Sequence, residues 1–149
     1  METSADLLSI LLVDDDKDDR FFFQEAFKEI EARASIQTVN DGEELMNYLT
    51  RSAITYPQII FLDLNMPRKG GLECLQEIRK NMEMKDIIII IYSTSSSEKD
   101  ISESFSIGAN LYLKKPNDYF TLIKLLTKVN GINWQEHAEK LCMENFLLS

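Results

Sequence analysis

Short apolar runs, each followed at once by polar residues, restrict the fold of this chain most. Leu7–Val13, Ile59–Leu62 and Ile87–Ile91 show little or no alternation of apolar and polar residues. Runs of this length are typical of strands buried on both faces, as in a parallel sheet. Two shorter segments, Ile36–Val39 and Leu111–Leu113, complete a set of five expected strands.

Between these strands, apolar residues recur at helical spacing. Helices are expected over about residues 17–34, around Leu45–Leu49, over Leu72–Met82, around Ile101–Phe105 with Gly108 as a C-terminal signal, and over about Asp118–Val129. Five strands alternating with five helices predict an α/β fold, a doubly wound five-stranded parallel (βα)5 sheet.

Composition limits the function classes. The 149 residues suit one domain, and the net charge of −9 argues against nucleic acid or an anionic membrane as a partner. The apolar runs are too short to cross a bilayer. No basic segment of a signal peptide occurs in Met1–Asp6, and Cys74 and Cys142 are expected to be reduced, so a cytoplasmic protein is expected.

A polar cluster follows four of the expected strands. These clusters are Asp14–Asp16, Asp63, Ser93–Ser97 and Lys114–Lys115. Because the carboxyl ends of parallel strands share one edge of the sheet, side chains far apart in sequence should meet there. Taken alone, the five acids within Asp14–Asp19 could equally be a solvated loop and helix N-cap.

The chemistry of the converging set points to phosphoryl transfer. The carboxylates of Asp14, Asp15 and Asp63 would repel one another unless a cation lay among them, and oxygen ligands suit Mg²⁺. Lys115 offers an ammonium and Ser93 a hydroxyl, both able to bind phosphate oxygens. Asp63, with Mg²⁺, is therefore a candidate nucleophile that accepts a phosphoryl group.

Four sequence elements resemble the response-regulator receiver domain of two-component signalling, over about residues 7–130. They are Val13-Asp14-Asp15, Leu62–Pro67 with Gly70-Gly71, Ser93-Thr94, and Tyr112–Pro116. The resemblance implies a flavodoxin-like, CheY-like fold with phosphorylation on Asp63. It further implies that Asp15, Asp63, the backbone carbonyl of Asn65 and, through water, Asp14 bind Mg²⁺.

The same resemblance gives roles to residues around the site. Ser93 and Tyr112 stand at the family's hydroxyl and aromatic switch positions, and Lys115 would contact the phosphate. The Lys115–Pro116 bond is expected to be cis. Asn65 and Ser95 occupy the variable positions that tune dephosphorylation. Residues 63–71, 93–100 and 108–112 resemble the stand-alone receivers that serve bacterial phytochromes and other sensor kinases.

Residues 131–149 are expected to form a short C-terminal helical extension and no output domain. Its apolar residues are Trp134, Ala138, Leu141, Cys142 and Phe146. The extension could fold back on the receiver, extend the preceding helix or form a homodimer contact. His137, expected to be exposed, is a poor candidate for a phosphodonor.

Two functions are open at this point. The first is a phosphorylation-switched module that receives phosphate from a sensor histidine kinase or phosphotransfer protein and binds a downstream protein target around Tyr112. It would be no enzyme beyond weak autophosphatase activity. The second is a constitutive interaction scaffold on the same fold. The complete set of Asp14, Asp15, Asp63, Ser93 and Lys115 favours the first, because an unused site gains nothing from a repulsive acidic cluster.

Overall fold

A computed structural model describes residues 7–51 and 53–148 and shows one parallel sheet covered by helices. Residues 1–6, on which the signal-peptide expectation depends, lie outside this range. The strand order is β2-β1-β3-β4-β5-β6, and every pair is parallel. The strands are β1 (Leu8–Val13), β2 (Ala34–Val39), β3 (Ile59–Leu62), β4 (Ile88–Ser93), β5 (Leu111–Lys114) and β6 (Leu147–Leu148).

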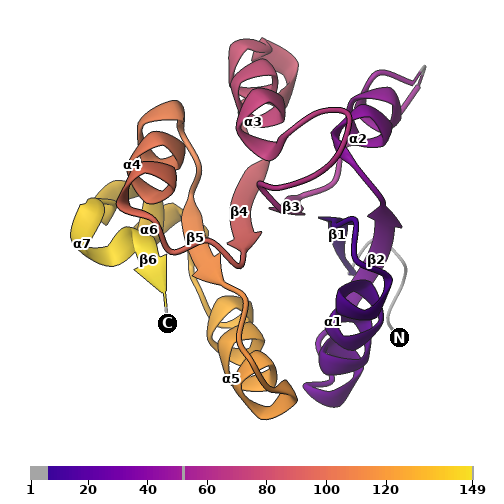
Figure 1. Ribbon diagram of the computed structural model, residues 1–149, viewed down its shortest axis with the longest axis vertical. Helices are drawn as coiled ribbons and strands as arrows, with labels where there is room; N and C mark the ends of the chain where they lie inside the picture. The colour runs from indigo at the N-terminus through magenta and orange to yellow at the C-terminus, as the bar shows by residue number, and fades with distance from the viewer. Residues whose placement is uncertain (1–6, 52, 149) are drawn as a thin grey trace.

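Helices cover both faces of the sheet (Figure 1). They are α1 (Lys17–Glu29), α2 (Gly42–Leu49), α3 (Gly71–Lys80), the 3₁₀ helix η2 (Met82–Met84), α4 (Glu98–Ile107), α5 (Tyr119–Asn130), α6 (Trp134–Lys140) and α7 (Met143–Phe146). Figure 1 shows α1 and α5 on one side and α2, α3 and α4 on the other. The expected doubly wound α/β fold is confirmed.

Alternation along the buried strands explains the two layers. In β1, Ile10 and Leu12 belong to the apolar cluster beneath α1 and α5, whereas Leu11 and Val13 belong to the cluster beneath α2 and α3. Successive side chains of a strand point to opposite faces, so a strand that is apolar throughout fills two cores at once. The unbroken apolar runs thus place β1, β3 and β4 in the centre of the sheet.

Some expected boundaries were wrong. The helix expected to reach residue 34 ends at Glu29, because Glu31 adopts a φ of +54°, and Ala34 begins β2. Met82 lies outside α3, because Asn81 is extended and separates that helix from η2. Ser93, expected in a loop, is the last residue of β4.

The expectation of five strands was also wrong, because the C-terminal segment adds a sixth. The described part of this segment contains α6, α7 and β6, and it folds back on the receiver. Leu147 and Leu148 pair with Tyr112 and Leu113 of β5. His137 is only partly exposed, and its Nε2 lies 2.7 Å from the carbonyl oxygen of Asn110.

Phe146 anchors this segment. Its ring is fully buried, 6.1 Å from the ring of Tyr112 and 5.2 Å from that of Phe105 between ring centroids. The segment therefore covers the free edge of β5 and one side of α4. Across the described residues, no helix combines the length and apolar character needed to cross a membrane.

Candidate functional site

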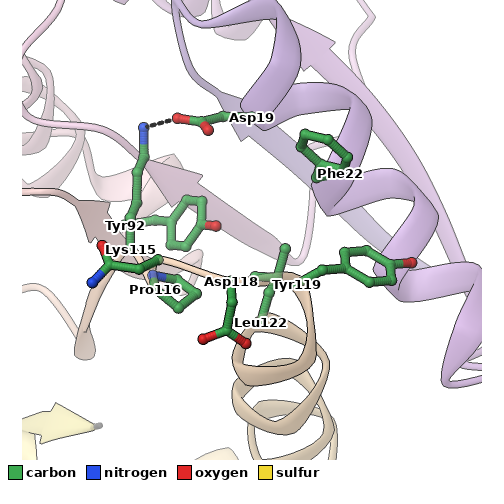
Figure 2. Close-up of a pocket in the computed structure, with 9 residues that line it drawn as sticks. Asp19, Phe22, Tyr92, Lys115, Pro116, Asp118, Tyr119 and Leu122 are labelled. Carbon is green, nitrogen blue, oxygen red and sulfur yellow. Dashed lines mark hydrogen bonds and ion pairs between the residues drawn. The ribbon is translucent and has the colours of Figure 1, made fainter.

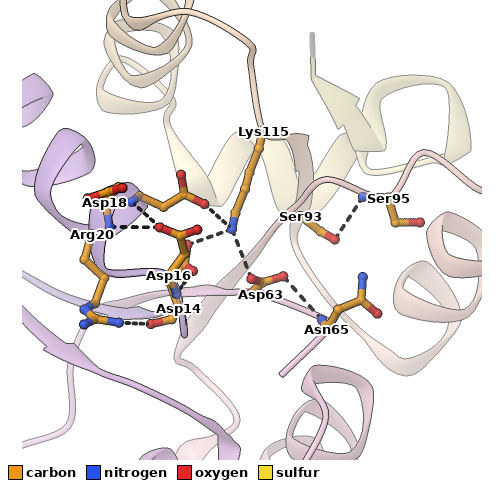
Figure 3. A network of polar contacts seen from close by, with 10 residues as sticks. Asp14, Asp16, Asp18, Arg20, Asp63, Asn65, Ser93, Ser95 and Lys115 are labelled. Carbon is orange, nitrogen blue, oxygen red and sulfur yellow. Dashed lines mark hydrogen bonds and ion pairs between the residues drawn. The ribbon is translucent and has the colours of Figure 1, made fainter. Parts of the chain in front are cut away.

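The carboxyl ends of β1, β3, β4 and β5, with the loops that follow them, bring the expected polar residues together at one edge of the sheet. Figure 3 shows Asp14, Asp63, Ser93 and Lys115 gathered there, with the start of α1 alongside. Asp14, Asp63 and Ser93 are buried, and the Lys115 side chain is only 8% exposed. The convergence predicted from strand ends is present.

Three carboxylates form a group that fits a metal ion. Oxygen atoms of Asp14, Asp15 and Asp63 all lie within 4.8 Å of one another. Asp15 is exposed and the other two are buried, so the cluster opens to solvent on one side. Oxygen ligands that leave room for water suit a hard divalent cation.

Asp14 is held firmly in this group. Its Oδ1 accepts a hydrogen bond from the backbone N–H of Asp16 at 2.9 Å, and its carbonyl oxygen accepts one from Arg20 Nη1 at 2.7 Å. Its buried Oδ2 lies 2.8 Å from Lys115 Nζ, an ion-pair distance, but no group donates a hydrogen bond to it with good geometry. A buried carboxylate oxygen without a donor is what a cation or its water would satisfy.

Lys115 links the acids through its ammonium. Its Nζ donates to Asp63 Oδ2 at 3.0 Å and to Asp19 Oδ2 at 2.9 Å, in addition to the ion pair with Asp14. Burial alone would lower the pKa of Lys115, but the surrounding carboxylates outweigh it and raise this pKa. The lysine is therefore a fixed positive charge within an acidic site.

Burial raises the pKa of the two buried acids, whereas attraction to Lys115 lowers it. Burial raises the pKa of Asp14 from 3.8 to about 6, despite the opposing effect of Lys115. Burial also raises the pKa of Asp63, again against the attraction of Lys115. Without a metal, the site thus favours the protonated form of these carboxyl groups more than water does.

This shift predicts a pH-dependent metal affinity. Mg²⁺ requires the carboxylate form, so protons compete with it once the pH falls below the raised pKa of Asp14, about 6. Calorimetric titration should show similar Mg²⁺ affinity at pH 7 and 8. Below pH 6, affinity should weaken toward roughly tenfold per pH unit. An affinity that is constant from pH 5 to 8 would contradict the assignment of Asp14 to the metal site.

Ser93 and Tyr112 are connected through Ser95. The Ser95 backbone N–H donates to Ser93 Oγ at 3.2 Å, and the Tyr112 hydroxyl donates to the Ser95 carbonyl oxygen at 2.8 Å. The Tyr112 ring is fully buried, and the Ser95 hydroxyl donates to Asp100 on α4. A displacement of Ser93 would therefore reach both α4 and the ring of Tyr112.

Three other expectations concern the peptide bond before Pro116, the role of Asn65 and the N-cap of α1. The Lys115–Pro116 bond is trans, so the expected cis bond was wrong; the trans form is intrinsically preferred even before proline. Asn65 donates its backbone N–H to Asp63 Oδ1 at 3.3 Å, and the use of its carbonyl as a ligand stays a prediction. The N-cap interpretation of the acidic run holds for Asp16, which accepts from the N–H groups of Asp18 and Asp19.

Two features of the site were not foreseen. Asp19 reaches Lys115, although 96 residues separate them. Arg68, in the loop after β3, donates from Nε to buried Asp41 at the start of α2 at 2.8 Å and so ties that loop to the helix. No sequence pattern indicates either contact, because each one joins two segments that lie far apart in the chain.

Comparison with known proteins identifies the family of this chain. The model of the "Response regulator receiver domain" family matches residues 10–127. The response regulator Rcp1 of Synechocystis sp. is 33% identical over 131 residues, which cover 85% of this chain and 88% of that protein. The resemblance inferred from the four motifs is thereby confirmed.

Solved structures agree. The phosphorylated cyanobacterial phytochrome response regulator RcpA matches with a TM-score of 0.77 and 34% identity, over 83% of this chain and 91% of that one. The Mn²⁺-bound form of Rcp1 matches with a TM-score of 0.76 and 32% identity, over 83% and 92%. This chain belongs to the response regulator receiver domain family and is homologous to stand-alone regulators of two-component systems.

Proposed function

We propose that this chain is a single-domain response regulator whose Asp63 accepts a phosphoryl group, with Mg²⁺, from a sensor histidine kinase or phosphotransfer protein. The observation that carries the proposal is the buried Asp63 carboxylate, held 3.0 Å from Lys115 Nζ inside a cluster of metal-type oxygen ligands. The phosphorylated form would change its binding to a downstream protein, as a cytoplasmic switch.

The residues divide the work of the transfer. A carboxylate oxygen of Asp63 attacks phosphorus of a phosphohistidine; the P–N bond breaks as the P–O bond forms, and the leaving imidazole nitrogen keeps the electron pair. Lys115 and the Ser93 hydroxyl bind phosphoryl oxygens, and Asp14, Asp15 and Asp63 would hold the metal. Mg²⁺ supplies neutralisation of charge on the transferring group. Hydrolysis of the acyl phosphate would return Asp63 to its carboxylate form, and we expect only weak autophosphatase activity.

The test uses a small phosphodonor. The chain is incubated with acetyl phosphate and Mg²⁺, and its intact mass is measured beside Asp63→Asn and a metal-free sample. We expect one phosphate-sized gain that disappears in both controls. If wild-type protein shows no gain, and no beryllofluoride binding with Mg²⁺, the constitutive scaffold is the better description.

One approach to the site passes between the first turns of α1 and α5, whose residues line a cavity beside Lys115. Large aromatic side chains are exposed there: Phe21 (56%), Phe22 (48%) and Phe120 (77%). The ring of Phe22 lies 6.1 Å from that of Tyr119 between centroids. An exposed apolar group of this kind beside a reactive residue fits a partner surface, and we assign it to the phosphodonor.

Phe22→Ser should therefore separate the two phosphodonors. With a histidine kinase that phosphorylates the wild-type chain, transfer should slow by about tenfold, because buried aromatic residues dominate interface energies. With acetyl phosphate, phosphorylation should be unchanged. Met82→Ser is the matched control, since Met82 is 74% exposed but lies on η2, after α3 and away from the site. Equal effects of the two substitutions on the kinase reaction would refute the assignment.

The output surface includes Tyr112, as the family position implies, but the C-terminal segment covers it here. Phe146 packs on the Tyr112 ring and β6 pairs with β5. A partner that responds to the position of Tyr112 would therefore bind a surface formed jointly by α4, β5 and α7. We propose that the C-terminal segment, from α6 to β6, acts as part of the switch surface.

A further inference from the structure

Lys115 has one more carboxylate partner than phosphoryl transfer requires. Its Nζ lies 2.8 Å from Asp14 Oδ2, 2.9 Å from Asp19 Oδ2 and 3.0 Å from Asp63 Oδ2. Two of these carboxylates, Asp19 and Asp63, accept hydrogen bonds from the ammonium, and Asp14 pairs with it by charge. Asp14 and Asp63 have roles in the proposed function, and Asp19 has none.

Asp19 approaches the ammonium from outside. It lies in the first turn of α1, where its backbone N–H donates to the N-cap Asp16 at 3.0 Å. Its side chain is 37% exposed, whereas those of Asp14 and Asp63 are buried. Figure 2 shows its carboxylate bonded to Lys115 at the edge of a cavity of about 310 Å³ that Tyr92 and Pro116 also line.

In the proposed function, the three carboxylates differ in how far they stay available to Lys115. A bound cation would draw Asp14 toward itself, and phosphorylation turns Asp63 into an acyl phosphate whose new oxygens seek an N–H of Lys115. Asp19 is then the one of the three that still offers a free carboxylate to the ammonium. Its negative charge also lies close to the dianionic phosphoryl group, in a partly buried place where screening by solvent is reduced.

We propose that Asp19 is a counter-ion of Lys115 that competes with the phosphoryl group and so weakens the hold of the site on it. Asp19 acts through Lys115, which makes it a positioning residue and not a catalytic one. The inference rests on the proposed function and adds a means of setting how strongly the phosphorylated state is held. Removal of the Asp19 charge should therefore tighten binding, whereas loss of a merely structural contact would weaken it.

The experiment measures beryllofluoride, a phosphoryl analogue, by ¹⁹F NMR at saturating Mg²⁺. Asp19→Asn keeps the size and an acceptor oxygen and removes the charge. It should bind beryllofluoride at least about threefold more tightly than wild type, an effect expected for a partly exposed ion pair. Asp19→Glu, which keeps the charge, should stay near wild type, and Asp19→Ala should resemble Asp19→Asn.

Asp18→Asn is the matched control. Asp18 lies in the same turn of α1 and is exposed, and its substitution changes the net charge equally without touching Lys115. Its affinity should equal that of wild type. Equal affinities of Asp19→Asn and Asp18→Asn, or weaker binding by Asp19→Asn, would overturn the inference. Absence of binding by wild-type protein would instead refute the proposed function, so the two failures are distinguishable.

Discussion

Gly71→Ala should disturb the site strongly, and far more than the same substitution at the neighbouring Gly70. A Cβ at Gly71 would lie 2.2 Å from the carbonyl oxygen of Asp63 and 2.9 Å from Leu64 Cα, both backbone atoms. Either α3 or the end of β3 must move to relieve this overlap. We expect the free energy of unfolding to fall by about 1–3 kcal/mol. We expect Mg²⁺ affinity to fall by about 10–100-fold if relief of this overlap moves the backbone of Asp63, which carries one of the metal-type carboxylates.

Gly70→Ala is the matched control. A Cβ at Gly70 would have its nearest contact at 3.5 Å, the carbonyl oxygen of Leu64, which is an ordinary van der Waals distance. Its unfolding free energy and Mg²⁺ affinity should stay close to those of wild type. Chemical denaturation and calorimetric Mg²⁺ titration of both variants measure the two effects. If Gly71→Ala bound Mg²⁺ like wild type, α3 would not be what fixes Asp63.

Phe146→Ala should release the C-terminal segment. The ring is fully buried against Tyr112 and Phe105, and truncation of a buried phenylalanine costs about 3–5 kcal/mol. The measurable loss cannot exceed the free energy with which the segment docks, because the receiver can remain folded after the segment detaches. Hydrogen exchange should therefore show fast amides in α7 and β6 and slow amides in β1, β3 and β4.

The neighbouring residue gives the control for this prediction. Leu147 lies next to Phe146 but is 43% exposed, so Leu147→Ala should cost less than about 1 kcal/mol and leave the exchange pattern unchanged. In Phe146→Ala, the Tyr112 ring should become accessible to solvent, which ultraviolet difference absorbance reports. Equal exchange in the two variants would show that Phe146 does not hold the segment.

The sequence predicts the centre of this fold better than its edges. Runs such as Ile59–Leu62 read as central strands because burial on both faces leaves no polar position. The end of α1 could not be read, since apolar residues at helical spacing continue past Glu31, where the backbone turns. The strand Leu147–Leu148 is too short for any periodic pattern, and only the free edge of β5 explains its pairing.

The functional site likewise has a part that the sequence predicts and a part that it does not. Asp63 and Lys115 could be placed because each follows a strand, and parallel strands bring such ends together. The Asp19–Lys115 and Asp41–Arg68 pairs join helix starts to loops, whose relative positions depend on packing across the whole molecule. Sequence order contains no record of such contacts. They are nevertheless the contacts that fix the charge around Asp63 and the loop that follows it.

The most direct test of the central claim is to locate the phosphoryl group. The chain is treated with acetyl phosphate and Mg²⁺, an acyl phosphate is reduced with borohydride to the corresponding alcohol, and the peptides are sequenced by tandem mass spectrometry. The account predicts homoserine in place of Asp63 in the treated sample, and aspartate there when Mg²⁺ is omitted. Homoserine at Asp14, Asp15 or Asp19 with Asp63 intact would contradict it.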